Sequence, residues 1–360
     1  MTSHDKARTS ARDGGAMRPN APGTPHDGAG PAGAAFSFPV RWADIQAARE
    51  RLHAAQTALL VTHVAPDGDA IGSLCALGLA LRALGKSVTL ACDDPVPEIY
   101  RFIPGSAEMV RVVPAGSEFD LVVALDCADM ARTGKAGQAP GRDPDLNFDH
   151  HVTNPGFADI NFVNADAAAT AEVLYELSEP LGLPLEKKVA ECLMAGLVAD
   201  TQGFRTTSVT PRSLAVAQGL MAAGASLSKI YDMTLNRRSF HAARLWGEGL
   251  TRLKLENGVV WTSLPLAAKQ AIGYKGVGDA DLVNVLTTIY EARIAIIFVE
   301  RDDGKVKISL RAHPGLDVSV VAKSFGGGGH EAAAGAEIEG TLEEVEARVL
   351  RAVRQAIPNL

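Results

Sequence analysis

The segment TALLVTHVAPDGDAIGSLCALGLALRALGK, residues 57–86, decides the fold class of this chain. It begins with a short apolar run, residues 57–64, of the kind that forms a buried strand. The stretch that starts at Asp69 has the apolar pattern of a helix, and Gly85 marks the end of that helix. A buried strand, a short loop and a helix in this order predict one unit of an α/β fold.

Further apolar runs extend this pattern along the chain. SVTLACD (87–93) and FDLVVALDC (119–127) are continuously apolar, and DLNFDHH (145–151) ends a shorter run. Continuous apolar runs are typical of the central strands of a parallel sheet. We therefore predict an N-terminal domain with a mainly parallel sheet and helices on both faces. Ligands of such sheets bind at the carboxyl ends of the strands.

Length, charge and cysteine content limit the classes of protein that fit. A chain of 360 residues, 47% of them hydrophobic, is long enough for two domains. It has no run of about 20 apolar residues and no secretory signal pattern, so we expect a cytoplasmic protein without a membrane partner. The net charge of -7 disfavours binding of long duplex nucleic acid but is compatible with a small anionic substrate. The four cysteines are widely spaced, and we expect buried free thiols.

Changes in composition along the chain suggest its domain boundaries. Residues 1–38 are rich in Gly, Pro, Ala, Ser and Thr and predict a disordered tail. We predict the parallel α/β domain over residues 39–235 and a helical linker over 236–258. Strand patterns, a glycine run and a terminal helix predict a second, smaller α/β domain over residues 259–360.

Acidic and histidine side chains follow the predicted strands and one helix of the first domain. Each would be unremarkable alone, since such residues often cap helices or form turns. Several carboxylates at one sheet edge, however, raise one another's pKa values unless cations are present. Carboxylates with imidazoles suit manganese, iron, zinc or cobalt, and paired metals commonly serve in phosphate ester hydrolysis. The residues concerned are His63, Asp67, Asp69, Asp126, Asp149, His150, His151 and Asp200.

Motifs in a fixed order give the chain a resemblance to the DHH phosphoesterase family, from about Trp42 to the C-terminus. The last motif is similar to the DHH-associated domain of the oligoribonuclease and phosphoadenosine-phosphate phosphatase branch, and differs from the C-terminal domain of family II inorganic pyrophosphatases. The motifs are HVAPDGDAIGS (63–73), ALDCADMAR (124–132), NFDHHVTN (147–154), LVADTQGF (197–204) and GGGGHEAAAG (326–335).

This resemblance implies a catalytic role for the domain at residues 39–235, with a site for two divalent metal ions, of which manganese is the expected one. It also implies that Asp149 orients the paired histidines and that His151 lies close to the substrate phosphate. The implied metal ligands are His63 and Asp67 for the first ion, Asp126 for both ions, and Asp69, His150 and Asp200 for the second ion.

The glycine run of the second domain suggests a substrate-binding role. Glycine lets backbone N–H groups face an anion without a Cβ in the way, so a phosphate-binding nest is plausible, with a flexible linker as the alternative. Arginines and histidines nearby would bind phosphate, or would simply be surface cations. The substrate contacts implied by the resemblance are Arg311, His313, Gly327, Gly328, Gly329 and His330 in the second domain and Arg132 in the first.

The sequence and its resemblance together predict a hydrolase that degrades very short RNA and dinucleotides to 5′-mononucleotides. A further candidate substrate is 3′-phosphoadenosine 5′-phosphate, and a homodimer is a candidate assembly. The enzymatic alternatives are a cyclic di-AMP phosphodiesterase and a RecJ-like single-strand exonuclease. A nucleotide sensor without catalysis is disfavoured because every implied metal-ligand position is filled.

Overall fold

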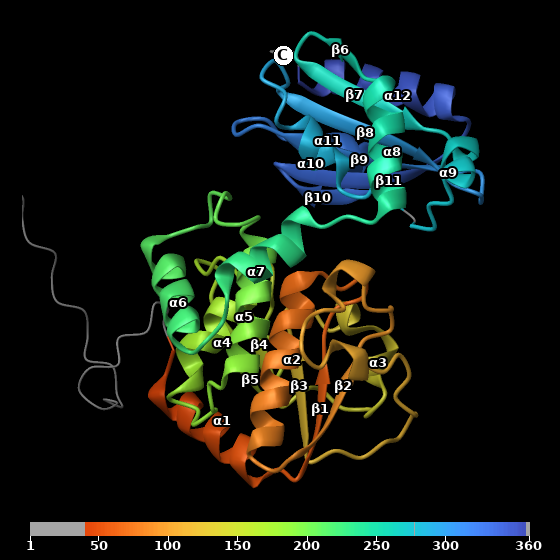
Figure 1. The fold of residues 1–360 in the computed structure, drawn as a ribbon. Coiled ribbons are helices and arrows are strands. Elements are labelled where there is room, and N and C mark those ends of the chain that lie inside the picture. Colours follow the sequence, from red (N-terminus) through yellow and green to blue (C-terminus); the bar gives the residue numbers. More distant parts are fainter. Residues whose placement is uncertain (1–39, 277, 358–360) are drawn as a thin grey trace, which may run out of the picture. The chain divides into compact units, whose positions relative to one another are not determined.

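The computed structural model describes residues 40–276 and 278–357 (Figure 1). The predicted disordered tail, residues 1–38, lies outside them. The chain divides into two compact units with the boundary between Leu235 and Asn236. Each unit has its own sheet and its own apolar core.

The first unit is built on a five-stranded parallel sheet, which confirms the predicted α/β class. Its strands are β1 (Thr57–Val61), β2 (Ser87–Ala91), β3 (Leu121–Leu125), β4 (Leu146–Asp149) and β5 (Ile160–Val163). They lie in the order β2-β1-β3-β4-β5, and every neighbouring pair is parallel. The sequence analysis did not predict β5, because this strand is only four residues long and alternate positions are only partly buried.

Helices pack on both faces of this sheet. They are α1 (Trp42–Ala54), α2 (Gly68–Ala83), α3 (Gly134–Gln138), α4 (Thr170–Ser178), α5 (Lys187–Asp200), α6 (Pro211–Ala222) and α7 (Leu227–Tyr231). Successive strand residues point to opposite faces, so Leu60 and Val123 pack in the core formed with α2, α4 and α5. Leu59 and Val122 pack on the other face with Ala136 of α3.

The strand order reverses at β1, and this reversal locates the crevice of the sheet. The chain passes from β1 to β2 on one side, whereas β3 pairs with the other side of β1. Loops leave the two sides of such a reversal in opposite directions and open a crevice at the carboxyl ends of the strands. His63 follows β1 and Asp126 follows β3, so both lie at this crevice.

The second unit contains a six-stranded mixed sheet with helices on both faces. Its strands are β6 (Lys254–Glu256), β7 (Val259–Leu264), β8 (Ile294–Glu300), β9 (Lys305–Ala312), β10 (Gly328–His330) and β11 (Ala333–Glu339). Its helices are α8 (Phe240–Thr251), α9 (Leu266–Ile272), α10 (Leu282–Leu286), α11 (Ser319–Ser324) and α12 (Leu342–Ala356). The order is β10-β11-β9-β8-β7-β6, in which β7 and β8 are parallel and the other pairs are antiparallel.

The segment expected to be a helical linker, residues 236–258, contributes to this second unit. Leu245 of α8 is fully buried in a core with Val260 and Leu282. The same segment continues into β6, which pairs with β7. Helix α8 is therefore a core helix of the second unit, and its apolar residues form its buried face.

The glycine run forms a strand that the sequence did not predict. Residues Gly328–His330 are strand β10, which pairs antiparallel with β11. A Cβ at Gly327 would overlap the carbonyl oxygen of Gly335, and one at Gly329 would overlap that of Ala333. Close strand contact thus requires glycine here, and the alternative of a flexible linker is wrong. Glycine is rare in strands, which is why the pattern did not indicate one.

Two other expectations concern the cysteines and the membrane. Cys75, Cys92, Cys127 and Cys192 are buried free thiols, as predicted. Among the described residues, no helix combines the length and the apolar character that crossing a bilayer requires.

Close packing of α2 on α5 should depend on Gly72. A Cβ at this position would lie 2.6 Å from the carbonyl oxygen of Cys192 and 2.9 Å from the backbone nitrogen of Gly196. We expect Gly72→Ala to lower the free energy of unfolding by about 1–3 kcal/mol, because both neighbours are backbone atoms. Urea unfolding followed by circular dichroism would measure this change.

The matched control is Gly247→Ala in α8, where an added Cβ meets open space. We expect this exposed substitution to be neutral or to stabilise the protein by up to about 1 kcal/mol, since alanine favours the helix. Equal stability of the two variants would contradict the role assigned to Gly72.

Candidate metal centre

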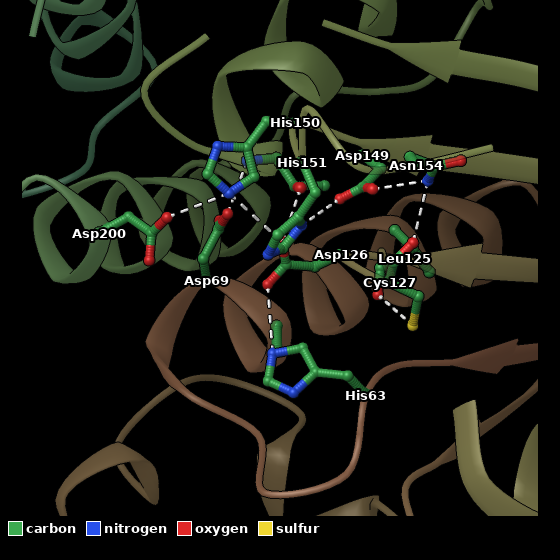
Figure 2. Close-up of polar contacts among 12 residues, drawn as sticks. His63, Asp69, Leu125, Asp126, Cys127, Asp149, His150, His151, Asn154 and Asp200 are labelled. Atoms are coloured by element: carbon green, nitrogen blue, oxygen red, sulfur yellow. Dashed lines mark hydrogen bonds and ion pairs between the residues drawn. The ribbon is translucent and has the colours of Figure 1, made fainter. Parts of the chain in front are cut away.

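Carboxylates and imidazoles from separate segments converge at the carboxyl edge of the first sheet (Figure 2). The loop after β1, the start of α2, the ends of β3 and β4, and the end of α5 supply them. Three sets of ligand atoms each lie within 4.8 Å of one another. These sets are His63, Asp67 and Asp126; Asp126, His150 and His151; and Asp69, His150 and Asp200.

The sets overlap, because Asp126 belongs to two of them and His150 links the remaining one. Asp126 Oδ2 lies 3.6 Å from His63 Nε2, whereas its Oδ1 lies 3.7 Å from His150 Nε2. Its two oxygens thus face different sides of the cluster. A carboxylate in this position is suited to hold two neighbouring cations at once.

Backbone carbonyl groups orient the rings of His63 and His150. His63 Nδ1 lies 2.8 Å from the carbonyl oxygen of Val64, and His150 Nδ1 lies 3.3 Å from that of Ala167. A carbonyl oxygen can only accept, so Nδ1 of each neutral ring carries the hydrogen. The Nε2 lone pairs then face the carboxylates, and His150 Nε2 lies 3.2 Å from Asp200 Oδ2. Histidines that bind metals are held in this way.

A carboxylate orients the other histidine of the pair. His151 Nδ1 donates to Asp149 Oδ1 at 2.7 Å, and Asn154 Nδ2 donates to Asp149 Oδ2 at 2.6 Å. The hydrogen bond to Asp149 raises the pKa of His151 against the opposing effect of burial. In this structure Asp149 contacts the ring of His151, whereas the carbonyl of Ala167 contacts that of His150.

Burial and mutual repulsion dominate the electrostatics of the cluster. Burial, and then the charges of neighbouring carboxylates, raise the pKa values of Asp69 and Asp200 well above their ordinary range. Burial acts in the same sense on Asp126, but its interactions with His63 and His150 outweigh it and lower the pKa to about 2. Buried carboxylates in this number need a compensating positive charge. The donor set of carboxylate oxygens and imidazole nitrogens fits divalent transition-metal ions.

Asp67 serves as a helix cap with one oxygen and faces the cluster with the other. Its Oδ1 accepts the backbone N–H groups of Asp69 and Ala70 at 3.0 Å each, at the start of α2. Its Oδ2 lies 3.8 Å from His63 Nε2. The cap and the candidate ligand are therefore compatible roles of one side chain.

Several residues that support the cluster were missed by the sequence analysis. The backbone N–H groups of Thr170 and Ala171 donate to Asp69 at 2.6 and 3.0 Å, and the Ser73 hydroxyl donates at 3.1 Å. The Thr170 hydroxyl also donates to Asp126 at 2.9 Å. Thr170 lies 101 positions from Asp69, so no local pattern could have revealed this contact.

Arg132 lies beside the cluster through its backbone rather than through its side chain. Its carbonyl oxygen accepts the N–H of Val64 at 2.9 Å, next to His63. The side chain is exposed and forms no ion pair within the described part of the chain. The predicted substrate contact of Arg132 therefore stays a prediction.

Two of the substrate residues predicted in the second unit, Arg311 and His330, lie on one face of its sheet. His330 is paired with Ala333, and Ala333 is paired with Arg311, so all three lie in one row across β10, β11 and β9. Directly opposed residues point to the same face. Arg311 Nε donates to Asn284 Oδ1 at 3.2 Å, which fixes the guanidinium. His313, just beyond β9, is exposed.

Comparison with known proteins adds family membership to this geometry. The DHH family N-terminal domain matches residues 57–197, and the DHHA1 domain matches residues 272–359. The bifunctional oligoribonuclease and PAP phosphatase NrnA of Thermus thermophilus is 34% identical over 326 residues, which are 89% of this chain and 96% of that protein. The protein of the same name from Bacillus subtilis is 29% identical over 78% of this chain and 89% of its own length.

Solved structures agree with these relationships. An exopolyphosphatase-related protein from Bacteroides fragilis has a TM-score of 0.80 and 26% identity, covering 88% of this chain and 97% of its own. RecJ from Thermus thermophilus, in complex with Mn²⁺, has a TM-score of 0.50 and 15% identity, which shows a shared fold alone, and only 54% of that chain is covered. The two matched domains and the extended identity to the Thermus relative show that this chain belongs to the DHH family and carries a DHHA1 domain.

Proposed function

We propose that this protein is a metal-dependent hydrolase that cleaves very short RNA and dinucleotides to 5′-mononucleotides. We further propose that it removes a phosphate from 3′-phosphoadenosine 5′-phosphate. The observation that carries the proposal is the overlap of the ligand sets through Asp126 and His150. The substrate class rests on the Thermus and Bacillus relatives, whose names describe an oligoribonuclease and PAP phosphatase.

The proposed cofactor is a pair of divalent ions, with manganese as the first candidate. When bound, such ions neutralise charge on a phosphate ester and make water a better nucleophile at neutral pH. The overlap of the ligand sets supports two ions rather than one, since a single ion would leave part of the cluster unused. The residues that would hold them are His63, Asp67 and Asp126 for one ion and Asp69, Asp126, His150 and Asp200 for the other.

His151 is proposed to contact the phosphate directly. Its Nδ1 is engaged by Asp149, so the ring has a fixed orientation and its Nε2 is the nitrogen left for a substrate oxygen. A protonated imidazole gives a phosphate oxygen a charge-assisted hydrogen bond. The raised pKa of His151 favours that protonated form.

The second unit is proposed to bind nucleotide through its own cationic side chains. Arg311 and His330 lie in one row of the sheet with only the small side chain of Ala333 between them. Among residues 40–276 and 278–357, Arg311 makes its hydrogen bonds through Nε and Nη1, which leaves Nη2 to contact a phosphate or a base. Arg132, His313 and the segment Gly327–His330 remain proposed contacts on the strength of the family resemblance.

The alternatives fit less well. A RecJ-like exonuclease is disfavoured because only about half of RecJ is covered, at 54%, and because a net charge of -7 opposes a long polyanion. A nucleotide sensor without catalysis is disfavoured because each candidate ligand lies in one of the three sets. Cyclic di-AMP remains the closest rival substrate, since it carries the same phosphodiester chemistry.

Turnover of substrates of graded length tests the proposal. We expect purified protein with manganese to hydrolyse 5′-labelled RNA of two to about four nucleotides faster than RNA of about twenty, and to accept 3′-phosphoadenosine 5′-phosphate. Chelation should abolish both activities, because the carboxylate cluster alone has no electrophile. Gel or chromatographic quantification of the products gives the rates, with linear and cyclic di-AMP assayed in parallel. Faster processive loss of the long strand would assign the protein to the exonuclease alternative.

Replacing the shared carboxylate gives the second test. Asp126→Asn keeps the shape of the side chain but removes the charge that faces both sides of the cluster. We expect the hydrolysis rate to fall at least about 10²-fold, since losing one electrostatic contributor of this kind typically costs that much. The circular dichroism spectrum should be unchanged. Activity within a factor of two of the wild type would refute the bridging role.

Metal binding should also appear in stability. Ions that bind only the folded state stabilise it by about 2.7 kcal/mol per site at a hundred times the dissociation constant. We therefore expect manganese to raise the melting temperature of chelator-treated protein, and to raise that of Asp126→Asn much less. Differential scanning calorimetry measures both shifts. A wild-type melting temperature independent of manganese would contradict the proposed centre.

Arg311 provides a test of the second unit. Loss of a charged hydrogen bond costs about 1.5–3 kcal/mol, so we expect Arg311→Gln to raise KM for dinucleotide about 10- to 100-fold. The control is Arg351→Gln in α12, which removes the same charge from an exposed position. Steady-state kinetics of both variants, with their melting curves, would separate binding from folding. Equal KM values would remove Arg311 from the proposed substrate contacts.

A further inference from the structure

The start of α4 supplies hydrogen-bond donors to two carboxylates of the candidate metal centre. Thr170 is fully buried, and its hydroxyl donates to Asp126 Oδ1 at 2.9 Å. Its backbone N–H donates to Asp69 Oδ2 at 2.6 Å, and the N–H of Ala171 donates to Asp69 Oδ1 at 3.0 Å. One residue therefore contacts both Asp69 and Asp126 through different groups.

The Asp126 carboxylate has an orientation that needs to be held. The residue adopts a left-handed backbone conformation, with a φ of 57°, which only a few residue types tolerate. The last side-chain torsion of aspartate is broad, so the carboxylate could rotate with little resistance. The hydroxyl of Thr170 contacts Oδ1 specifically, the oxygen that faces His150, and leaves Oδ2 toward His63.

The position of Thr170 is itself well determined. Its backbone is held by Asp69, and the preceding turn is held by Glu172, whose Oε2 accepts the N–H of Ala168 and the hydroxyl of Ser213. Threonine is branched at Cβ and therefore has few rotamers in a helix. The hydroxyl is thus directed at Asp126 by the fold, before any ligand binds.

We propose that Thr170 is a positioning residue that fixes the Asp126 carboxylate so that each of its oxygens is presented to a different cation. This inference rests on the proposed metal centre and assigns Thr170 no direct contact with substrate. An outer hydrogen bond of this kind typically contributes 10- to 100-fold to metal affinity. Replacing only the side chain of Thr170 removes the hydroxyl contact to Asp126. The contact of its backbone N–H with Asp69 is retained.

Calorimetric titration of chelator-treated, full-length protein with manganese tests this role. Thr170→Val retains the shape of the side chain without the hydroxyl, whereas Thr170→Ser retains the donor. We expect Thr170→Val to weaken manganese binding 10- to 100-fold and Thr170→Ser to bind within about threefold of the wild type. The matched control is Thr262→Val, since Thr262 is equally buried and its hydroxyl donates to the Gly249 carbonyl in the other unit.

The control separates a positioning role from a structural one. Melting temperatures in chelator should fall similarly for Thr170→Val and Thr262→Val, and only the former should lose metal affinity. Wild-type affinity in Thr170→Val, or equal losses in the valine and serine variants, would overturn the proposal. If Thr170→Val does not fold, Thr170→Ala takes its place in the titration. If neither variant folds, Thr170 is a structural residue and the proposal is wrong. Absence of manganese binding by the wild type would instead refute the metal centre itself.

Discussion

The structure of the first unit depends on burying several carboxylates together at the end of a parallel sheet. Asp69 and Asp126 are almost completely inaccessible to solvent, and Asp200 lies next to them. An uncompensated buried charge is expensive, so each carboxylate needs donors or a cation. Asp69 obtains donors from α4 and from Ser73, whereas Asp126 is surrounded by imidazoles. The order of strands, the start of α4 and the histidine pair all serve this one requirement.

Because of this requirement, the cluster and the fold share the same interactions. Asp67 both begins α2 and faces His63, and Glu172 anchors the start of α4 to α6 through Ser213. The close approach of α2 and α5 at Gly72 belongs to the same frame, since these helices bear Asp69 and Asp200. A change in helix packing would therefore move the carboxylates, even without touching them.

Features encoded in short stretches could be predicted from the sequence. Strands β1 to β4 show as apolar runs, and His63, Asp126 and His150 follow shortly after three of them, because the carboxyl edge of a sheet collects the residues that end its strands. Features that depend on residues far apart in the sequence could not be predicted. Thr170 and Ser73 look like ordinary helix residues until Asp69 lies beside them. Strand β10 and the first half of β11 consist mainly of glycine and alanine, which are both depleted in strands, so their sequence does not indicate strands.

Because the chain is acidic, phosphate binding at the carboxylate cluster requires bound divalent ions. A phosphate near Asp69, Asp126 and Asp200 would meet like charges in a buried setting, where Coulomb repulsion is poorly screened. Divalent ions held by those carboxylates would reverse the sign of the local potential over a few ångströms only. The chain as a whole, with a net charge of -7, would still repel a long polyanion. A substrate with few phosphates is attracted by the ions and is repelled only weakly by the rest of the protein. The same electrostatics therefore favour both a metal-dependent site and short nucleotides.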